Sequence, residues 1–115
     1  MPTIYIIGDS TVEDNKPPFR GWGWALPKFL REGVQVQNHA MSGRSTRSFV
    51  DEGRFDPVRE GMKPGDVLMI QFGHNDSKES DTTRYAAPFG AYQENLRIFI
   101  DHALSVAAKP VLFTP

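Results

Sequence analysis

Three short polar clusters in this sequence each follow directly after an apolar run. They are residues 8–11 (Gly-Asp-Ser-Thr), 38–43 (Asn-His-Ala-Met-Ser-Gly) and 73–76 (Gly-His-Asn-Asp). A serine where a buried strand enters a loop, as Ser10 is, has its hydroxyl at the carboxyl edge of a sheet, where open α/β proteins bind ligands. Such a hydroxyl becomes a nucleophile when a base accepts its proton. A single serine in this position is more often a helix N-cap or a loop residue, but three clusters at strand ends together indicate an active site.

The segments that precede the clusters have the composition of strands. β-branched and aromatic residues are concentrated or alternate there, and Gly8 ends the first run. Short apolar runs of this kind are typical of buried parallel strands. Strands are therefore predicted at residues 3–8, 34–38, 67–72 and 111–113.

Apolar residues at helical spacing predict two longer helices. The first begins at Trp22 or Trp24 and ends at about Glu32, with Pro27 tolerated near its start. The second covers residues 92–107, where charged residues lie off the apolar face, as in a helix packed on a sheet. A short helix within 42–52, a turn at 55–60 and loops at 11–21 and 76–88 complete the pattern.

The alternation of strands and helices predicts the fold class. Strands joined by helical crossovers form parallel sheets with right-handed connections. We therefore predict a flavodoxin-like three-layer α/β sandwich with the strand order 2-1-3-4. The last strand has no helix to cover it, so a fifth strand is expected beyond it. Residues 1–115 then form the N-terminal half of one domain of about 200–250 residues.

Composition excludes several classes of function. The chain has 115 residues, a formal net charge of −1 and no cysteine. A net charge so close to zero predicts no attraction to nucleic acid or to an anionic membrane. Without cysteine there is no thiolate nucleophile, and the histidines lack the spacing of metal ligands. We therefore expect neither a metal nor a cofactor.

The two ends of the chain suggest a location and a partner. The N-terminus enters a strand within three residues, which leaves no room for a signal peptide, so a cytoplasmic protein is expected. A mature secreted chain whose signal peptide has been removed would have the same N-terminal pattern. The uncovered edge of the fourth strand invites pairing with another chain. We therefore expect a homodimer formed through this edge.

The three clusters resemble the first three conserved blocks of the SGNH, or GDSL-type, hydrolases. The resemblance is closest to the rhamnogalacturonan acetylesterase-like branch. There the first block reads Gly-Asp-Ser-Thr, the second resembles residues 38–46 (Asn-x-x-x-Ser-Gly-Arg-Ser-Thr), and the third reads Gly-His-Asn-Asp. Residues 22–24, Trp-Gly-Trp, also look like that branch. Three blocks in the right order, over essentially the whole chain, are far more specific than one.

The resemblance implies the SGNH hydrolase fold and an ester hydrolase with a serine nucleophile. Ser10 matches the nucleophile, and the backbone N–H groups of Ser10 and Gly43 and the side-chain amide of Asn75 match the oxyanion hole. The family's fourth block, Asp-x-x-His, supplies the catalytic histidine and aspartate and does not occur in these 115 residues. Without a base, only about 10³–10⁴-fold acceleration over water would remain. We therefore expect this chain alone to be close to inactive.

The same resemblance implies an acetylated, pectin-type oligosaccharide as the small-molecule substrate. Trp22 and Trp24 are candidates to stack on a sugar ring, although packed tryptophans are commoner. Arg44 is a candidate contact for an acidic sugar through its forked guanidinium, with a solvated loop charge as the alternative. His74 lies beside Asn75 and is a further candidate substrate contact. His74 could also be considered as the base, but in the family pattern its position is the variable one within the third block, which argues against that role.

Two other functions stay open from the sequence. A non-catalytic module would keep the cleft, bind an acyl or sugar ligand and pair through its fourth strand. A lysophospholipase or thioesterase would use the same three blocks on a different ester. The exact residues of the first and third blocks favour acetyl groups on carbohydrates over lipid esters, but only through the resemblance to the family.

Overall fold

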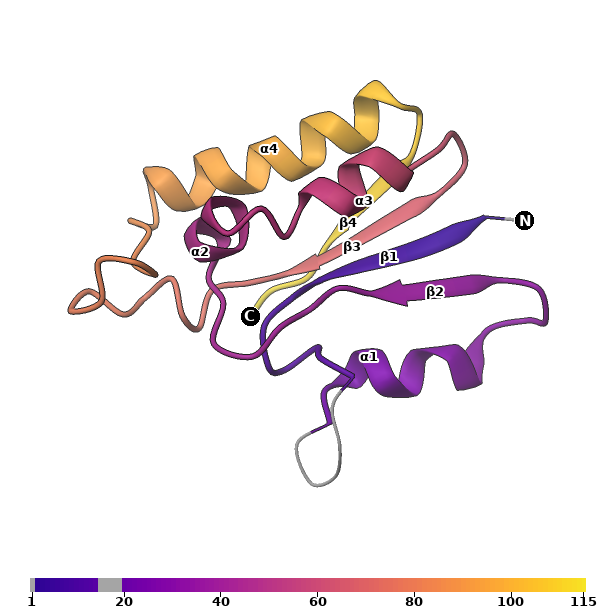
Figure 1. The fold of residues 1–115 in the computed structure, drawn as a ribbon, viewed down its shortest axis with the longest axis horizontal. Helices are drawn as coiled ribbons and strands as arrows, with labels where there is room; N and C mark the ends of the chain where they lie inside the picture. The colour runs from indigo at the N-terminus through magenta and orange to yellow at the C-terminus, as the bar shows by residue number, and fades with distance from the viewer. Residues whose placement is uncertain (1, 15–19) are drawn as a thin grey trace.

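The computed structural model describes residues 2–14 and 20–115, and a four-stranded parallel sheet forms its centre (Figure 1). The strands are β1 (Thr3–Gly8), β2 (Gln35–Asn38), β3 (Val67–Gln71) and β4 (Lys109–Leu112). They lie in the order β2-β1-β3-β4, and every pairing is parallel. This arrangement confirms the predicted strand order.

β1 lies in the interior of the sheet, between β2 and β3. Its Ile4 is in register with Val36 of β2 on one side and with Val67 of β3 on the other. All residues of β1 after Thr3 are buried, because helices cover both faces of the sheet. The edge strand β2 instead alternates between exposed and half-buried residues. The unbroken apolar run before Ser10 therefore follows from the central position of β1.

Helices cover both faces of the sheet and produce three layers (Figure 1). One face carries α1 (Trp22–Ala25), which continues into the 3₁₀ helix η1 (Leu26–Phe29). The other face carries α2 (Thr46–Asp51), α3 (Asp56–Gly61) and α4 (Ala91–Ser105). The predicted three-layer α/β sandwich is thereby confirmed. In the part of the chain that the structure describes, no helix has the length and apolar character needed to span a membrane.

Each face of the sheet has its own apolar core. Beneath α2 and α4, the rings of Phe49, Phe72 and Phe99 are fully buried. The centroid of Phe49 lies 5.3 Å from that of Phe72 and 6.2 Å from that of Phe99, both edge-to-face. Such pairs each contribute about 0.5–1.5 kcal/mol beyond the area they bury. The smaller core under α1 includes Ile4 and Ile6. Together the two cores fix the positions of the strand ends.

The predicted helix from residue 22 to residue 32 is wrong in its extent. α1 has four residues, and η1 follows it only as far as Phe29. Pro27 explains the difference, because a proline inside an α-helix cannot donate a hydrogen bond and clashes with the preceding turn. At the start of η1 this donor is not needed. Of the predicted loop at 11–21, residues 15–19 lie outside the described residues.

β4 begins two residues earlier than predicted and contains Pro110. A proline is tolerated there because β4 forms the edge of the sheet, where a missing backbone donor disrupts less of the ladder. β4 pairs with β3 on one side, and no strand among residues 2–14 and 20–115 pairs with its other side. The homodimer expected through this edge stays a prediction.

α4 ends two residues earlier than predicted, in a turn that contains Ala107 and Ala108. The N–H of Ala107 donates to the C=O of Leu104 at 3.1 Å, and the N–H of Ala108 donates to the C=O of Ala103 at 2.9 Å. These two bonds form a Schellman motif, whose first residue beyond the cap is left-handed and usually glycine. Ala107 has a φ of 61° there. This conformation costs an L-residue about 1–2 kcal/mol.

We expect Ala107→Gly to raise the free energy of unfolding by about 0.5–1 kcal/mol, because relief of the left-handed strain exceeds the extra entropy that glycine loses on folding. Urea denaturation of the variant and the parent protein measures the difference. Ala91→Gly is the matched control, since Ala91 is the first residue of α4 and glycine should not stabilise it. A less stable Ala107→Gly variant would contradict the interpretation of this turn.

Candidate active site

The three polar clusters meet at the carboxyl edge of the sheet. Residues 9–11 follow β1, residues 39–43 follow β2 and residues 73–76 follow β3. Because these strands are parallel, their carboxyl ends lie at the same edge. The N–H of Met41 donates to the C=O of Gly8 at 3.0 Å and so joins the second cluster to the first. The sheet topology therefore assembles segments that are distant in the sequence.

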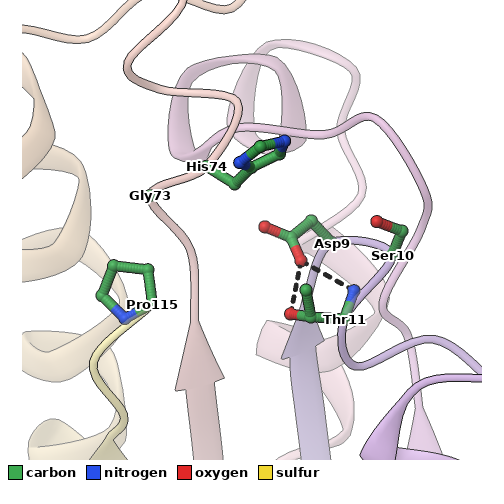
Figure 2. A pocket seen from close by; sticks show the side chains of 6 residues that line it. All are labelled: Asp9, Ser10, Thr11, Gly73, His74 and Pro115. Atoms are coloured by element: carbon green, nitrogen blue, oxygen red, sulfur yellow. Dashed lines mark hydrogen bonds between the residues drawn. The ribbon is translucent and has the colours of Figure 1, made fainter.

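A cavity of about 350 Å³ opens at this edge (Figure 2). Its wall consists of Asp9, Ser10, Thr11, Gly73, His74 and Pro115. Ser10 is exposed, so a substrate in the cavity can reach its hydroxyl. The structure thus places two of the predicted site residues, Ser10 and His74, around one cavity.

The turn that carries Ser10 is fixed by Asp9, which is 2% exposed. The Asp9 carboxylate accepts the N–H of Thr11 at 3.0 Å and the hydroxyl of Thr11 at 2.7 Å (Figure 2). The backbone C=O of Asp9 accepts the N–H groups of Val12 and Glu13, both at 3.1 Å. An aspartate that bonds the backbone two residues later forms an Asx turn. The residues around Ser10 are therefore held in place while its side chain stays accessible.

Glycine is needed at two positions around the site. A Cβ at Gly8 would lie 2.7 Å from the carbonyl oxygen of Gln71 and from Cγ2 of Val12, so a side chain would separate β1 from its neighbours. Gly43 has a φ of 78°, in the left-handed region that L-residues rarely adopt. A Cβ at Gly43 would meet nothing within 4 Å. Backbone conformation, not lack of space, therefore selects glycine where the predicted N–H donor lies.

Glu13 links the first cluster to the second. Its Oε2 accepts the backbone N–H of Ser42 at 2.8 Å and also accepts the Ser42 hydroxyl. Because Ser42 precedes Gly43, this carboxylate holds the turn that presents the Gly43 N–H. The C=O of Glu13 accepts the N–H of Gly21 at 2.7 Å, which anchors its backbone. The sequence analysis missed Glu13, since nothing in its local pattern indicates a partner in another loop.

Asn75 connects the third cluster to the second and is 3% exposed. Its Nδ2 donates to the C=O of Arg44 at 3.0 Å, and its Oδ1 accepts from Nη1 of Arg84 at 3.1 Å. Because Arg44 directly follows Gly43, this places Asn75 beside the turn that presents the Gly43 N–H. The wall of the cavity at Ser10 does not include Gly43 or Asn75. Their role in an oxyanion hole stays a prediction.

Asp76 fixes the third cluster to the start of α2. Its carboxylate oxygens lie 3.0 and 3.1 Å from the N–H of Thr46, the first residue of α2, and also accept the Thr46 hydroxyl. Nδ2 of Asn95 in α4 donates to the same hydroxyl oxygen at 3.2 Å. Burial raises the pKa of Asp76 above its ordinary value, the bonds from Thr46 oppose this shift, and the charge of Asp9 adds to it. Asp76 therefore serves the architecture of the site.

The two tryptophans predicted to bind a sugar are held by contacts within the protein. Nε1 of Trp22 donates to Oε1 of Gln71. The ring centroid of Trp24 lies 4.0 Å from the guanidinium carbon of Arg20 and 3.7 Å from the ammonium nitrogen of Lys28. The wall of the cavity described above includes neither tryptophan. These are the packing contacts considered as the alternative, and sugar stacking stays a prediction.

Arg44 is bonded to its own part of the chain. Its Nε and Nη2 donate to Oε1 of Glu52 at 3.1 and 3.0 Å, and its Nη1 donates to the C=O of Ser42 at 3.0 Å. Hydrogen bonds from Arg54 and then from Arg44 lower the pKa of Glu52. The Arg44 guanidinium thus stabilises the loop whose backbone meets Asn75. Contact of Arg44 with an acidic sugar stays a prediction.

His74 is the histidine that lines the cavity. Nε2 of His39 lies 3.2 Å from Oε1 of Gln37, and burial lowers the pKa of His39. Nε2 of His102 lies 3.1 Å from the carbonyl oxygen of Arg59 in α3. Across residues 2–14 and 20–115, no three His, Asp or Glu side chains are grouped so that they could hold a metal ion. His74 is thus the histidine placed at this cavity, and its contact with a substrate stays a prediction.

Comparison with known proteins places these features in a family context. A model of the GDSL-like lipase/acylhydrolase family matches residues 4–115. The rhamnogalacturonan acetylesterase RhgT of Bacillus subtilis is 44% identical over 114 residues, which cover 96% of this chain and 47% of RhgT. The probable rhamnogalacturonan acetylesterase YesY of the same bacterium is 40% identical over 114 residues, covering 97% of this chain and 52% of YesY. This chain thus spans about half the length of the curated relatives it matches.

Solved structures show the same fold. The protein YxiM of Bacillus subtilis superposes with a TM-score of 0.79 at 31% identity, covering 99% of this chain and 32% of YxiM. An acetyl xylan esterase of Geobacillus stearothermophilus superposes with a TM-score of 0.68 at 16% identity, covering 99% of this chain and 60% of the esterase. At that identity the second likeness concerns the fold alone.

Proposed function

Because the chain belongs to the GDSL-like lipase/acylhydrolase family, we propose that it forms the N-terminal part of a serine esterase in which Ser10 is the nucleophile. The exposed position of Ser10 on the cavity wall at the carboxyl edge of the sheet carries this proposal. The chain matches 47% of the length of RhgT and 52% of the length of YesY. We propose that the remainder of the catalytic domain, including its base, lies outside these residues.

In the proposed reaction, Oγ of Ser10 attacks the carbonyl carbon of an acetyl ester while a base accepts the hydroxyl proton. The N–H groups of Ser10 and Gly43 and Nδ2 of Asn75 stabilise the negative charge on the carbonyl oxygen of the tetrahedral intermediate. As the intermediate collapses, the C–O bond to the sugar breaks and the proton passes to the sugar oxygen. Water then attacks the acetyl group on Ser10 in the same way and releases acetate and the free serine.

The base of this reaction lies outside residues 1–115 in our proposal. These residues contain no Asp-x-x-His sequence. An oxyanion hole and substrate binding without a base give about 10³–10⁴-fold acceleration over water. Residues 1–115 alone are therefore expected to be close to inactive.

We propose acetyl groups on a pectin-type oligosaccharide as the substrate. Relatives named as rhamnogalacturonan acetylesterases are 40–44% identical to this chain, and two of the matches extend over nearly all of it. The cavity at Ser10, about 350 Å³, falls within the usual range for small-molecule sites, roughly 300–1,000 Å³.

Acetate release by the complete protein tests this function. On acetylated rhamnogalacturonan we expect a kcat/KM at least ~10-fold above that on acetylated xylan or on a long-chain p-nitrophenyl ester, because a polar site discriminates strongly between substrates. The chemically deacetylated polymer is the control. Faster hydrolysis of the long-chain ester would indicate a lipase or thioesterase specificity. Binding of the polymer without acetate release would indicate a non-catalytic module.

A further inference from the structure

We propose that Arg84 is a positioning residue for Asn75. The guanidinium of Arg84 holds the side-chain amide of Asn75 so that the N–H of Nδ2 not bonded to Arg44 is directed toward the oxyanion. Arg84 lies outside the three polar clusters, in the same segment between β3 and α4 as Asn75 and nine residues after it. This inference rests on the proposed function, because only there does Asn75 act as an oxyanion donor.

The two partners of Asn75 are chemically opposite. The carbonyl oxygen of Arg44, 3.0 Å from Nδ2, can only accept a hydrogen bond, and the guanidinium Nη1 of Arg84, 3.1 Å from Oδ1, can only donate one. If the amide were rotated by half a turn, Oδ1 would face the carbonyl oxygen of Arg44 and Nδ2 would face the guanidinium of Arg84. The first contact would join two acceptors and the second two donors. The orientation of the amide is therefore determined by chemistry. Nδ2 keeps one further N–H that the bond to Arg44 does not use.

Arg84 is itself held by Asp81. Its Nε donates to Oδ2 of Asp81 at 2.6 Å, while Oδ1 of Asp81 accepts the N–H of Thr83 at 3.0 Å and the Thr83 hydroxyl at 2.6 Å. These bonds, first from Thr83 and then from Arg84, lower the pKa of Asp81 to about 2. Asp81 is therefore charged at any pH suited to an esterase assay. The ion pair and the bond to Asn75 use two different nitrogens of the fork, which only arginine can provide.

The charge of Arg84 also bears on the strength of the donor. A cation that bonds to an amide oxygen polarises the amide, and its N–H groups become better donors. Without Arg84, the buried Oδ1 of Asn75 would lack a partner, and the amide would rotate to find one. Both effects matter most when the oxyanion carries full charge, so they should act on the transition state more than on the bound substrate.

Kinetics of the complete protein on an acetyl ester test the inference. Arg84→Ala should lower kcat by about 10- to 100-fold, less than loss of an oxyanion donor outright, and change KM by less than about threefold. Arg84→Lys should retain more activity than Arg84→Ala, because an ammonium group can still donate to Oδ1. Thr83→Val is the matched control, since it removes a bond to Asp81 from the same loop but leaves the bond from Arg84 to Asn75. Its kcat should stay near that of the parent.

A double-mutant cycle shows whether Arg84 acts through Asn75. In the Asn75→Ala background, Arg84→Ala should cause no further fall in kcat. An equal fall in both backgrounds, or a folded Arg84→Ala protein with the parent kcat, would overturn the inference and leave the proposed function intact. Full activity of Asn75→Ala would refute its oxyanion role and this inference together. If Arg84→Ala does not fold, Asp81→Asn replaces it in the cycle, because Asp81 holds Arg84. We then expect a smaller fall in kcat, and again no further fall in the Asn75→Ala background.

Discussion

Ser10→Ala should lower kcat of the complete protein on an acetyl ester by about 10⁴-fold or more, because the proposed mechanism forms the acyl intermediate on the Ser10 hydroxyl. The variant should fold normally, since Ser10 is exposed and the turn is held by the bonds of Asp9 to Thr11. The rate of acetate release at saturating substrate measures the effect. KM should change little, because the hydroxyl contributes to the reaction more than to binding.

Ser80→Ala is the matched control for this experiment. Ser80 is also an exposed serine, but it lies in the segment between β3 and α4 and does not line the cavity at Ser10. Its kcat should equal that of the parent protein. A Ser10→Ala protein that keeps more than about a tenth of the parent activity, where loss of a nucleophile should leave almost none, would refute the assignment of the nucleophile.

Asn75→Ala should lower kcat by about 10²–10³-fold, the usual effect of removing one donor from an oxyanion hole. It should also lower the free energy of unfolding by about 1–3 kcal/mol, since the C=O of Arg44 and the guanidinium of Arg84 both lose a partner. The two effects are separated by measuring kcat at a temperature where urea denaturation shows the variant to be fully folded.

Asn95→Ala controls for the loss of stability. Asn95 is a half-buried asparagine, and its Nδ2 donates to the Thr46 hydroxyl at 3.2 Å, in the network that fixes α2. This variant should lose stability to a similar or smaller extent but keep kcat within about threefold of the parent, because an interaction that does not change in the transition state leaves kcat unaltered. If both variants lose the same activity, Asn75 has a structural role only.

Elements whose own residues carry a pattern could be predicted from the sequence. The apolar run of β1 indicated a strand buried on both faces, and the alternation of strands and helices indicated a parallel sheet. The order β2-β1-β3-β4 was predicted with the flavodoxin-like fold, and the structure has it. The departures have local causes. Pro27 replaces the later turns of the first helix by η1, and Ala107 adopts a left-handed conformation that composition would assign to glycine.

The contacts that hold the candidate site together could not be predicted in the same way. Glu13 bonds Ser42 across two loops that the sheet topology brings together. Arg84 bonds Asn75 within the single segment between β3 and α4, and only the folding of that segment brings the two side chains together. A charged residue in a loop has the same local pattern whether it points to solvent or fixes a neighbouring turn. Candidate residues could be named from the sequence where they lie in blocks that resemble a known family, as Ser10, Gly43, His74 and Asn75 do.

Reaction of the complete protein with an organophosphonate ester, followed by crystallography of the adduct, tests the central claim most directly. We expect a single phosphonyl group on Oγ of Ser10, with its oxygen about 3 Å from the backbone nitrogens of Ser10 and Gly43 and from Nδ2 of Asn75. An adduct on another residue would contradict the assignment of the nucleophile. A phosphonyl oxygen beyond hydrogen-bond reach of both Gly43 and Asn75 would contradict the proposed oxyanion hole.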